Sequence, residues 1–272
     1  MPSDPKPSPT LETTRDLGKR IDWGKTAADY GRHRAGFPPA FFERLAAMRI
    51  IRAQGTALDL GSGTGTIARG LATRAMQVTG LDRSATMMEE AARLDREAGV
   101  TVGYVSASAE ETGLAASSFD LVTAGQCWHW FERSPAAAEA MRVLRPGGRI
   151  VIAHLDWIAT PDNVVEATEE LIRKFNPGWN LWGGTGIYPP WFRDLGGAGF
   201  KSIESFSFDI EVDYTHEAWR GRIRASAGVG AAMTPEQVAQ FDAAMVTMLA
   251  ARFPADPISA HHRVWAIVGA KP

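Results

Sequence analysis

A glycine-rich segment has the residue types and spacing most suited to chemistry. Residues 59–65 read DLGSGTG, and glycines at alternate positions let a backbone turn tightly and approach a ligand closely. Asp82 ends the next apolar run, 21 residues after Gly61, where a carboxylate can accept hydrogen bonds from both ribose hydroxyls. The spacing favours a nucleoside site over a glycine-rich turn of purely structural function.

Two common nucleotide-binding patterns do not fit this segment. A dinucleotide fingerprint requires Gly or Ala at position 66, where this chain has Thr66. A phosphate-binding loop requires Lys followed by Ser or Thr, and the segment has no such pair. The pattern is instead an acidic residue followed by three alternating glycines.

The elements around this loop alternate between strands and helices. Short apolar runs predict strands at 56–61, 77–82, 100–107, 119–125 and 149–155. Helical spacing of apolar residues predicts helices at 39–51, 66–74, 84–99 and 135–144, with Ser84 as an N-cap and Gly99 just past the helix end. This alternation predicts a parallel sheet with right-handed crossovers.

The alternation breaks after residue 156. Residues 161–175, 214–224 and 235–252 have helical patterns, whereas 176–192 is rich in Gly, Pro and aromatic residues and is predicted to be a loop. Strands are predicted at 201–212 and 262–271, and they suit an antiparallel pair at the edge of the sheet.

Composition narrows the class of protein. The 272 residues carry 29 Lys and Arg against 31 Asp and Glu, so the net charge of −2 gives no footprint for nucleic acid or an anionic membrane. The single Cys127 excludes a disulfide scaffold and is compatible with a reducing cytosol. No signal peptide or membrane span is evident, which favours a cytoplasmic protein, and residues 1–18 are expected to be a disordered tail.

Several motifs together resemble a known family. DLGSGTG (59–65), LDRSATMM (81–88), SASAEETGL (106–114), FDLVTAGQCWHWF (119–131) and VLRPGGRIVI (143–152) occur in the order typical of class I S-adenosylmethionine-dependent methyltransferases. The likeness is greatest to the small-molecule branch that contains trans-aconitate methyltransferases. It covers residues 21–155 well and the remainder only in layout. The family implies an α/β, Rossmann-like seven-stranded sheet with its last strand antiparallel and a helical substrate cap.

The resemblance assigns residues to the cofactor. It implies that Gly61, Gly63 and Gly65 line the methionine and ribose portions next to Asp59, and that Asp82 holds the ribose hydroxyls. Around the adenine and the sulfonium it implies Arg83, Ser108, Ala109 and Gln126. Many relatives have Asp in place of Ser108, which puts one adenine contact in question. Tyr30, in a Tyr-x-x-x-Arg segment, is a candidate to fold over the cofactor or simply to pack at a helix edge.

His129 is the candidate general base. It follows the fourth predicted strand directly, and imidazole titrates near neutral pH. A hydroxyl, amine or carbon acceptor can require such a base, whereas a carboxylate requires none. The alternative is a histidine that only hydrogen-bonds its loop. His154, within the fifth strand, fits a core position better. No spacing of His, Asp or Glu indicates a metal site.

Tryptophan is concentrated in one part of the chain. Seven of the nine tryptophans lie between residues 128 and 219, and aromatic side chains at the mouth of a site form broad apolar walls. Any one of them is expected to pack the cap onto the core, but at least two should face the substrate. Arg220 and Arg224 lie one helical turn apart and either hold a substrate carboxylate or form a solvated basic face. The candidate substrate residues are Trp128, Trp179, Trp182, Tyr188, Trp191, Trp219 and Arg224.

The sequence therefore predicts a methyltransferase of secondary metabolism that acts on a small aromatic or carboxylated metabolite, at O, N or C. The segments expected are the tail 1–18, a cofactor core with a lid segment (19–155), a cap and linker (156–200) and terminal strands (201–272) with a helical insertion (213–260). The alternatives are carboxyl methylation of a trans-aconitate-like acid and a non-catalytic cofactor-binding regulator or scaffold. Oligomeric state cannot be read from the sequence.

Overall fold

The computed structural model describes residues 36–230 and 232–272. These residues divide into two compact units. One, here called the core unit, comprises residues 36–155, Ile187–Phe208 and Val264–Pro272. The other, here called the helical unit, comprises Asp156–Gly186 and Asp209–Arg263. Tyr30 and the tail 1–18 lie outside the described residues.

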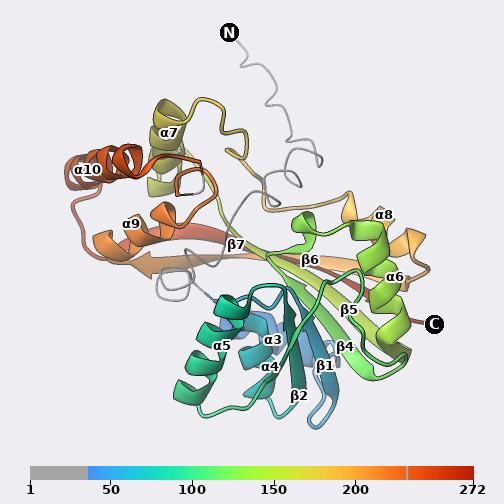
Figure 1. Ribbon diagram of the computed structural model, residues 1–272. Coiled ribbons are helices and arrows are strands. Elements are labelled where there is room, and N and C mark those ends of the chain that lie inside the picture. Colours follow the sequence, from blue (N-terminus) through green and yellow to red (C-terminus); the bar gives the residue numbers. More distant parts are fainter. Residues whose placement is uncertain (1–35, 231) are drawn as a thin grey trace. The chain divides into compact units, whose positions relative to one another are not determined.

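A seven-stranded sheet runs through the fold in the order β3-β2-β1-β4-β5-β7-β6 (Figure 1). The parallel strands are β1 (Thr56–Leu60), β2 (Gln77–Asp82), β3 (Gly103–Ser106), β4 (Phe119–Gly125) and β5 (Leu144–Trp157). The last two are β6 (Lys201–Tyr214) and β7 (Ile258–Ala270), and β7 is antiparallel to its neighbours. The predicted mixed sheet with β6 and β7 at its edge is confirmed.

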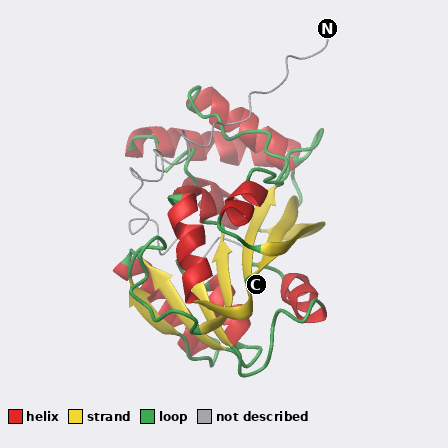
Figure 2. Cartoon of the chain, turned by 90° about the vertical axis from the view of Figure 1, so that its right-hand side faces the viewer, coloured by secondary structure: helices red, strands yellow, loops and turns green. Residues whose placement is uncertain are grey.

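Strand order reverses between β1 and β4, because β2 and β3 extend the sheet on one side of β1 while β4 and β5 extend it on the other. Right-handed crossovers in opposite directions place α4 (Thr66–Ala72) and α5 (Ala85–Glu97) on one face and α6 (Arg133–Val143) on the other. Figure 2, which turns the right-hand side of Figure 1 toward the viewer, shows a helix in front of the strands. Ligands of such folds collect at the carboxyl ends of the strands near this switch point.

The helices of the core unit begin and end much as the sequence indicates. α3 (Pro39–Ala47) buries Phe41, Phe42 and Leu45, and Ser84 caps α5 because its Oγ accepts from the Met87 N–H. The interiors of β1, β4 and β5 are mostly buried apolar residues, which is typical of parallel strands covered on both faces.

One helix was not predicted. Residues 176–192 were expected to be a loop, but α8 (Trp191–Gly197) begins inside that stretch. Its sequence ends in Gly196-Gly197, which disfavours a helix, yet Trp191 and Leu195 are one turn apart and both are buried. Packing of this apolar stripe, with α8 against α6, outweighs the weak intrinsic propensity.

β5 also begins earlier than predicted. Residues 145–148 were expected to separate helix from strand, but β5 starts at Leu144. Its first residues pair with the end of the chain, since Gly147 N–H donates to Lys271 O at 3.0 Å and Lys271 N–H donates to Gly148 O at 2.9 Å. A partner strand distant in sequence therefore extends β5 through its proline and glycines.

The helical unit contains α7 (Val164–Phe175), α9 (His216–Arg224) and α10 (Pro235–Arg252), and α10 packs on both of the others. Phe175 of α7 meets Phe241 of α10 edge to face, with ring centroids 5.5 Å apart. The chain returns to the core unit at Ile187, within the segment 156–200 that the sequence analysis grouped as cap and linker. In the described ranges no helix is both long and apolar enough to cross a membrane.

Candidate active site

The glycine loop follows β1 and is tied to the end of β2. Gly63 N–H donates to Asp82 Oδ2 at 2.8 Å, and Ser84 N–H donates to Asp82 Oδ1 at 2.9 Å. Each carboxylate oxygen has a second lone pair, and Asp82 is only half-buried. The loop thus fixes the orientation of the carboxylate and leaves one acceptor site on each oxygen for a diol.

At two positions of the loop, neighbouring atoms leave no room for a side chain, so glycine is required there. A Cβ on Gly61 would lie 2.9 Å from both Cys127 Sγ and Phe131 Cζ, and one on Gly65 would lie 2.7 Å from Tyr104 Oη. Both residues also have positive φ, 60° for Gly61 and 77° for Gly65. A Cβ on Gly63, by contrast, would touch only Met87 Cε at 3.9 Å, so the loop backbone is open beside the Asp82 carboxylate.

Asp59 lies under the loop and is almost fully buried. Its Oδ1 accepts a hydrogen bond from Thr123 Oγ1 at 2.6 Å. Burial raises the pKa of the Asp59 carboxyl to about 7, the Thr123 hydrogen bond opposes the rise, and the negative charge of Asp82 adds to it. Thr123 was not singled out in the sequence, although its position in the strand preceding the catalytic candidate is the signal that could have indicated it.

The chain after β4 brings further candidates to the same end of the sheet. Gln126 has a φ of 65°; its N–H donates to Ala153 O at 2.9 Å and its Nε2 donates to Leu155 O at 2.6 Å. His129 lies in the short helix η2 (Trp128–Trp130) and is half-buried, with its ring 4.1 Å from that of Trp130. Both residues follow directly from the strand that flanks β1, so loop, Asp82, Gln126 and His129 belong to one unit.

The expected adenine-edge residues follow β2 and β3. Arg83 is exposed beside Asp82, and Ala109 is buried in the core. The Oγ of Ser108 accepts from the Glu111 N–H at 3.1 Å, so this hydroxyl closes a local turn. Asp82 O accepts from the Ala107 N–H at 3.3 Å and joins this turn to the end of β2.

These residues fit the nucleoside and amino-acid portions of S-adenosylmethionine. The open backbone at Gly63, the oriented carboxylate of Asp82 and the chain after β4 surround the carboxyl ends of β1, β2 and β4. Among the described residues no cluster of three or more His, Cys, Asp or Glu side chains could hold a metal ion.

Three tryptophans assigned to the substrate are instead fully buried. Trp128 Nε1 donates to Asp194 Oδ2 at 3.0 Å, and Trp219 Nε1 donates to Thr168 Oγ1 at 3.0 Å. Trp191 stacks on Tyr188 with ring centroids 4.3 Å apart. These three rings have no exposed surface with which to meet an acceptor in this structure, because residue type and spacing alone do not determine which side of a segment is covered.

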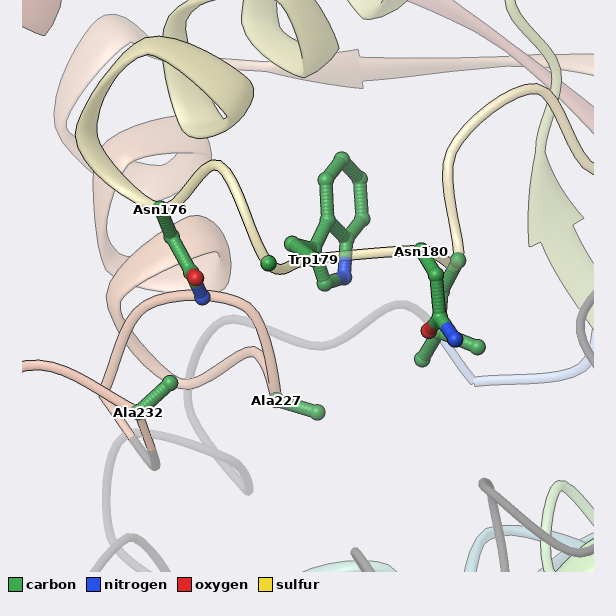
Figure 3. Close-up of a pocket in the computed structure, with 7 residues that line it drawn as sticks. Asn176, Trp179, Asn180, Ala227 and Ala232 are labelled. Carbon is green, nitrogen blue, oxygen red and sulfur yellow. The ribbon is translucent and has the colours of Figure 1, made fainter.

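Trp179 and Trp182 lie in the helical unit. Trp179, mostly buried, lines a cavity of about 170 Å³ with Asn176 and Asn180 on either side of it (Figure 3). Asn176 is fixed there because its Nδ2 donates to Gly228 O at 3.0 Å. Trp182 is half-buried, and the Arg173 guanidinium carbon lies 4.0 Å from its ring centroid.

Arg224 is committed to carboxylates of its own unit. Its Nη1 donates to Asp242 Oδ1 at 2.7 Å and its Nη2 donates to Glu217 Oε1 at 2.8 Å. Arg220 bonds the same two acidic residues. Burial lowers the pKa of the Arg224 guanidinium, but the hydrogen bonds to Glu217 and Asp242 outweigh it, and the pKa values of both guanidiniums are raised. Arg222 is directed elsewhere, with its guanidinium carbon 4.8 Å from the Trp157 ring centroid. The pair Arg220–Arg224 is therefore already neutralised.

Comparison with known proteins gives a consistent result. Residues 58–152 match a family described as a methyltransferase domain. An uncharacterized methyltransferase of Mycobacterium tuberculosis is 33% identical over 168 residues, which cover 58% of this chain and 64% of that protein. The 27-O-demethylrifamycin SV methyltransferase of Amycolatopsis mediterranei is 31% identical over 181 residues, 65% of this chain and 64% of that protein. The chain thus spans just under two thirds of the length of these curated relatives.

The solved structures agree with the fold. A protein from Anaeromyxobacter dehalogenans, assigned as a type II methyltransferase, superposes with a TM-score of 0.61 and 25% identity, covering 87% of this chain and 97% of that one. The matched segment 58–152 contains the glycine loop, Asp82, Gln126 and His129. Residues 58–152 therefore match a methyltransferase domain, and the sheet has the Rossmann-like fold of solved methyltransferase structures.

Proposed function

We propose that the protein transfers a methyl group from S-adenosylmethionine to a hydroxyl group of a small aromatic metabolite. The observation that carries this proposal is the glycine loop closed onto Asp82, with Gln126 and His129 in the chain that directly follows β4, the strand next to β1. The cofactor residues proposed are Asp59, Gly61, Gly63, Gly65, Asp82, Arg83, Ser108, Ala109 and Gln126.

Asp82 accepts hydrogen bonds from the ribose hydroxyls with the two lone pairs that Gly63 and Ser84 leave open. S-adenosylmethionine supplies an electrophilic methyl group on a sulfonium. The protein's own part in an in-line displacement is to align the acceptor and exclude water. Gln126, held by two hydrogen bonds to β5, keeps the chain after β4 in one conformation while this occurs.

His129 removes the acceptor proton. A hydroxyl is a poor nucleophile until it loses its proton, and a half-buried imidazole at the end of β4 can take it at neutral pH. The Amycolatopsis relative, by its name an O-methyltransferase, supports oxygen as the acceptor atom. The commitment of Arg220 and Arg224 to Asp242 and Glu217 favours an aromatic over a carboxylate acceptor.

We propose Tyr188 as an aromatic residue that contacts the acceptor, since it belongs to the core unit, is half-buried, and has its ring centroid 4.5 Å from that of His154, which in turn lies 5.1 Å from that of His129. Carboxyl methylation of a trans-aconitate-like acid is the second candidate, and it would require Arg224 to exchange an internal carboxylate for a substrate one.

The test is methyl transfer from trideuteromethyl-labelled S-adenosylmethionine to a panel of small phenols and carboxylic acids, followed by mass spectrometry. We expect labelled methyl ethers, and His129→Ala should lower kcat about 100-fold. His261→Ala is the matched control, because that imidazole bonds Asp209 and Glu211, and its kcat should equal that of the wild type.

The outcomes separate the candidates. Labelled esters in place of ethers would support the carboxyl methyltransferase. An unchanged kcat in His129→Ala would remove the general base. Binding of S-adenosylhomocysteine with no labelled product from any acceptor would favour a non-catalytic cofactor-binding role.

A further inference from the structure

The carbonyl of Thr64, near the end of the glycine loop, is held by a side chain from α4. Arg69 Nη2 donates to Thr64 O at 2.8 Å and to Ala91 O at 3.3 Å. Thr64 is 3% exposed, and the glycines on either side of it have positive φ, 53° for Gly63 and 77° for Gly65. Because glycine leaves the backbone free to adopt many conformations, the peptide groups beside it rotate readily unless a hydrogen bond holds them. Arg69 supplies such a hydrogen bond.

Arg69 is in turn fixed by residues of two neighbouring elements. Its Nε lies 2.9 Å from Asp95 Oδ1 of α5, and the two side chains of this ion pair are 18% and 4% exposed. Tyr104, on β3, donates from Oη to Asp95 Oδ2 at 2.7 Å. The Tyr104 ring lies against Gly80 of β2, since a Cβ there would be 2.5 Å from Tyr104 Cε1. Guanidinium, carboxylate and phenol therefore form one set of contacts, here called the Arg69 network (Arg69, Asp95 and Tyr104), that joins α4, α5 and β3.

The network contacts the loop at a second point. A Cβ on Gly65 would lie 2.7 Å from Tyr104 Oη and 3.2 Å from Arg69 Nη2, so both groups lie directly against the loop backbone. Gly63, on the other side of Thr64, donates to Asp82 Oδ2 at 2.8 Å. The loop is thus hydrogen-bonded on one side to the proposed ribose acceptor and on the other side to the Arg69 network.

A buried ion pair is not needed merely to join α4 and α5. Removing a guanidinium and a carboxylate from water costs free energy, and apolar side chains of similar volume commonly stabilise a protein as well as a buried ion pair does. An apolar side chain at position 69 could not donate to Thr64 O, and a buried carbonyl that loses its donor favours conformations in which it finds another one. What an apolar residue could not replace is therefore the hydrogen bond from Arg69 to the loop.

We propose that Arg69 is a positioning residue for the cofactor, which through Thr64 O fixes the glycine loop in the conformation that receives S-adenosylmethionine. This inference rests on the proposed function, because that function assigns the cofactor to this loop. Arg69 acts through Thr64 and is not itself one of the residues assigned to the cofactor. Asp95 and Tyr104 keep the guanidinium where it reaches the loop carbonyl.

The test compares Arg69→Gln with Arg93→Gln in the full-length protein. A glutamine at position 69 can place its Nε2 where Arg69 has Nε, beside Asp95, but it lacks the Nη2 that reaches Thr64 O. Arg93 is the matched control, because it is exposed on α5 and bonds Glu90 and Glu97. The control loses the same group and the same charge without a contact to the loop.

Hydrogen–deuterium exchange of the ligand-free protein, followed by mass spectrometry, measures the loop directly. The amides of Ser62 and Gly65 donate to Leu81 O and Ser62 O, at 2.9 and 2.8 Å, so the peptide 61–66 reports on loop opening. In Arg69→Gln we expect this peptide to exchange about tenfold faster, while β4 exchanges as in the wild type. Arg93→Gln should leave both rates unchanged. A purely structural role of Arg69 would instead accelerate the loop and β4 by the same factor.

Calorimetry supplies the second readout. S-adenosylhomocysteine should bind about tenfold more weakly to Arg69→Gln and with wild-type affinity to Arg93→Gln. Equal affinity in Arg69→Gln and the wild type, an unchanged loop exchange rate, or equal acceleration of the loop and β4 would each overturn the inference. Where Arg69→Gln does not fold, Tyr104→Phe replaces it. That variant removes only the hydrogen bond to Asp95 and should accelerate loop exchange about threefold, and an unchanged rate would overturn the inference.

The exchange experiment requires no ligand, so the two proposals can fail separately. A loop that opens faster in Arg69→Gln, in a protein whose wild type binds no S-adenosylhomocysteine, would count against the proposed function and not against the effect of Arg69 on the loop.

Discussion

Asp59 combines burial, a short hydrogen bond from Thr123 and a pKa near neutrality in one side chain of the cofactor loop. In the folded chain its pKa is about 7, against an ordinary value of 3.8. The unfolded chain therefore loses this proton first as the pH rises. The stability that protonated Asp59 contributes is fully present below about pH 4 and is lost progressively as the pH rises toward 7. Above about pH 7 the effect of Asp59 on the free energy of unfolding no longer changes with pH.

Asp59→Asn removes this titration while the amide oxygen can still accept from Thr123. We expect the variant to gain about 2.5 kcal/mol of stability relative to the wild type as the pH rises from 5 to 8. Urea unfolding followed by tryptophan fluorescence at several pH values measures the difference. A difference in the free energy of unfolding that does not change with pH would show that the carboxylate is ionised in both states.

The proposed cofactor residues could be placed together from the sequence, because backbone glycines and one carboxylate lie in a short, ordered pattern around β1 and β2. The role of individual aromatic residues could not be predicted in this way. Trp128 and Trp219 are directed inward by hydrogen bonds to Asp194 and Thr168, more than 50 residues away along the chain. Such partners leave no local signal in the sequence.

At the level of elements, the turn from β1 into α4 depends on Gly65. An alanine there meets both a positive φ of 77° and the Tyr104 hydroxyl at 2.7 Å. Gly99 has a similar φ of 67°, but no atom lies within 4 Å of a Cβ added there. Gly99→Ala therefore measures the effect of the backbone conformation alone, a loss of about 1 kcal/mol in the free energy of unfolding. Gly65→Ala should lose about 1–3 kcal/mol more and weaken S-adenosylhomocysteine binding.

Denaturant unfolding of both glycine variants, together with calorimetry, measures these two effects. Equal losses of stability, with unchanged affinity in Gly65→Ala, would contradict the close contact between the loop and Tyr104.

α8 is joined to the chain after β4 through Asp194. Its Oδ2 accepts from Trp128 Nε1 at 3.0 Å and from Arg133 Nη1 at 3.1 Å. Asp194→Ala leaves a fully buried indole N–H without its acceptor, so the free energy of unfolding should fall by about 1–3 kcal/mol. Arg193→Ala, exposed on the same helix, should change it by less than about 0.5 kcal/mol. Similar values for the two variants in urea unfolding would remove this role of Asp194.

Most elements of the sheet were predictable because buried parallel strands and their crossover helices have distinct periods. α8 and the first residues of β5 could not be predicted, since their stability comes from tertiary contacts. Trp191 and Leu195 of α8 are buried in the core, and Gly147 and Gly148 of β5 pair with Lys271. Local propensity at these places favours a turn.

At the level of the whole chain, the core unit is assembled from three separate stretches, and the helical unit is formed from the two stretches between them. The seven-stranded mixed sheet, with its last strand antiparallel, could be predicted from the family resemblance and the strand pattern. The division of the chain into two units at Ile187 and Phe208 could not be predicted, because the strands β5, β6 and β7 each continue from one unit into the other.

The central claim is that the glycine loop and Asp82 hold S-adenosylmethionine in the core unit. Titration calorimetry with S-adenosylhomocysteine tests it directly in the wild type, in Asp82→Asn and in Glu89→Gln, an exposed control on α5 that removes the same charge. We predict binding of one equivalent to the wild type and to Glu89→Gln, and affinity at least about tenfold weaker in Asp82→Asn, a loss of about 1.4 kcal/mol. Equal affinity in Asp82→Asn and the wild type, or no binding by the wild type, would contradict the account.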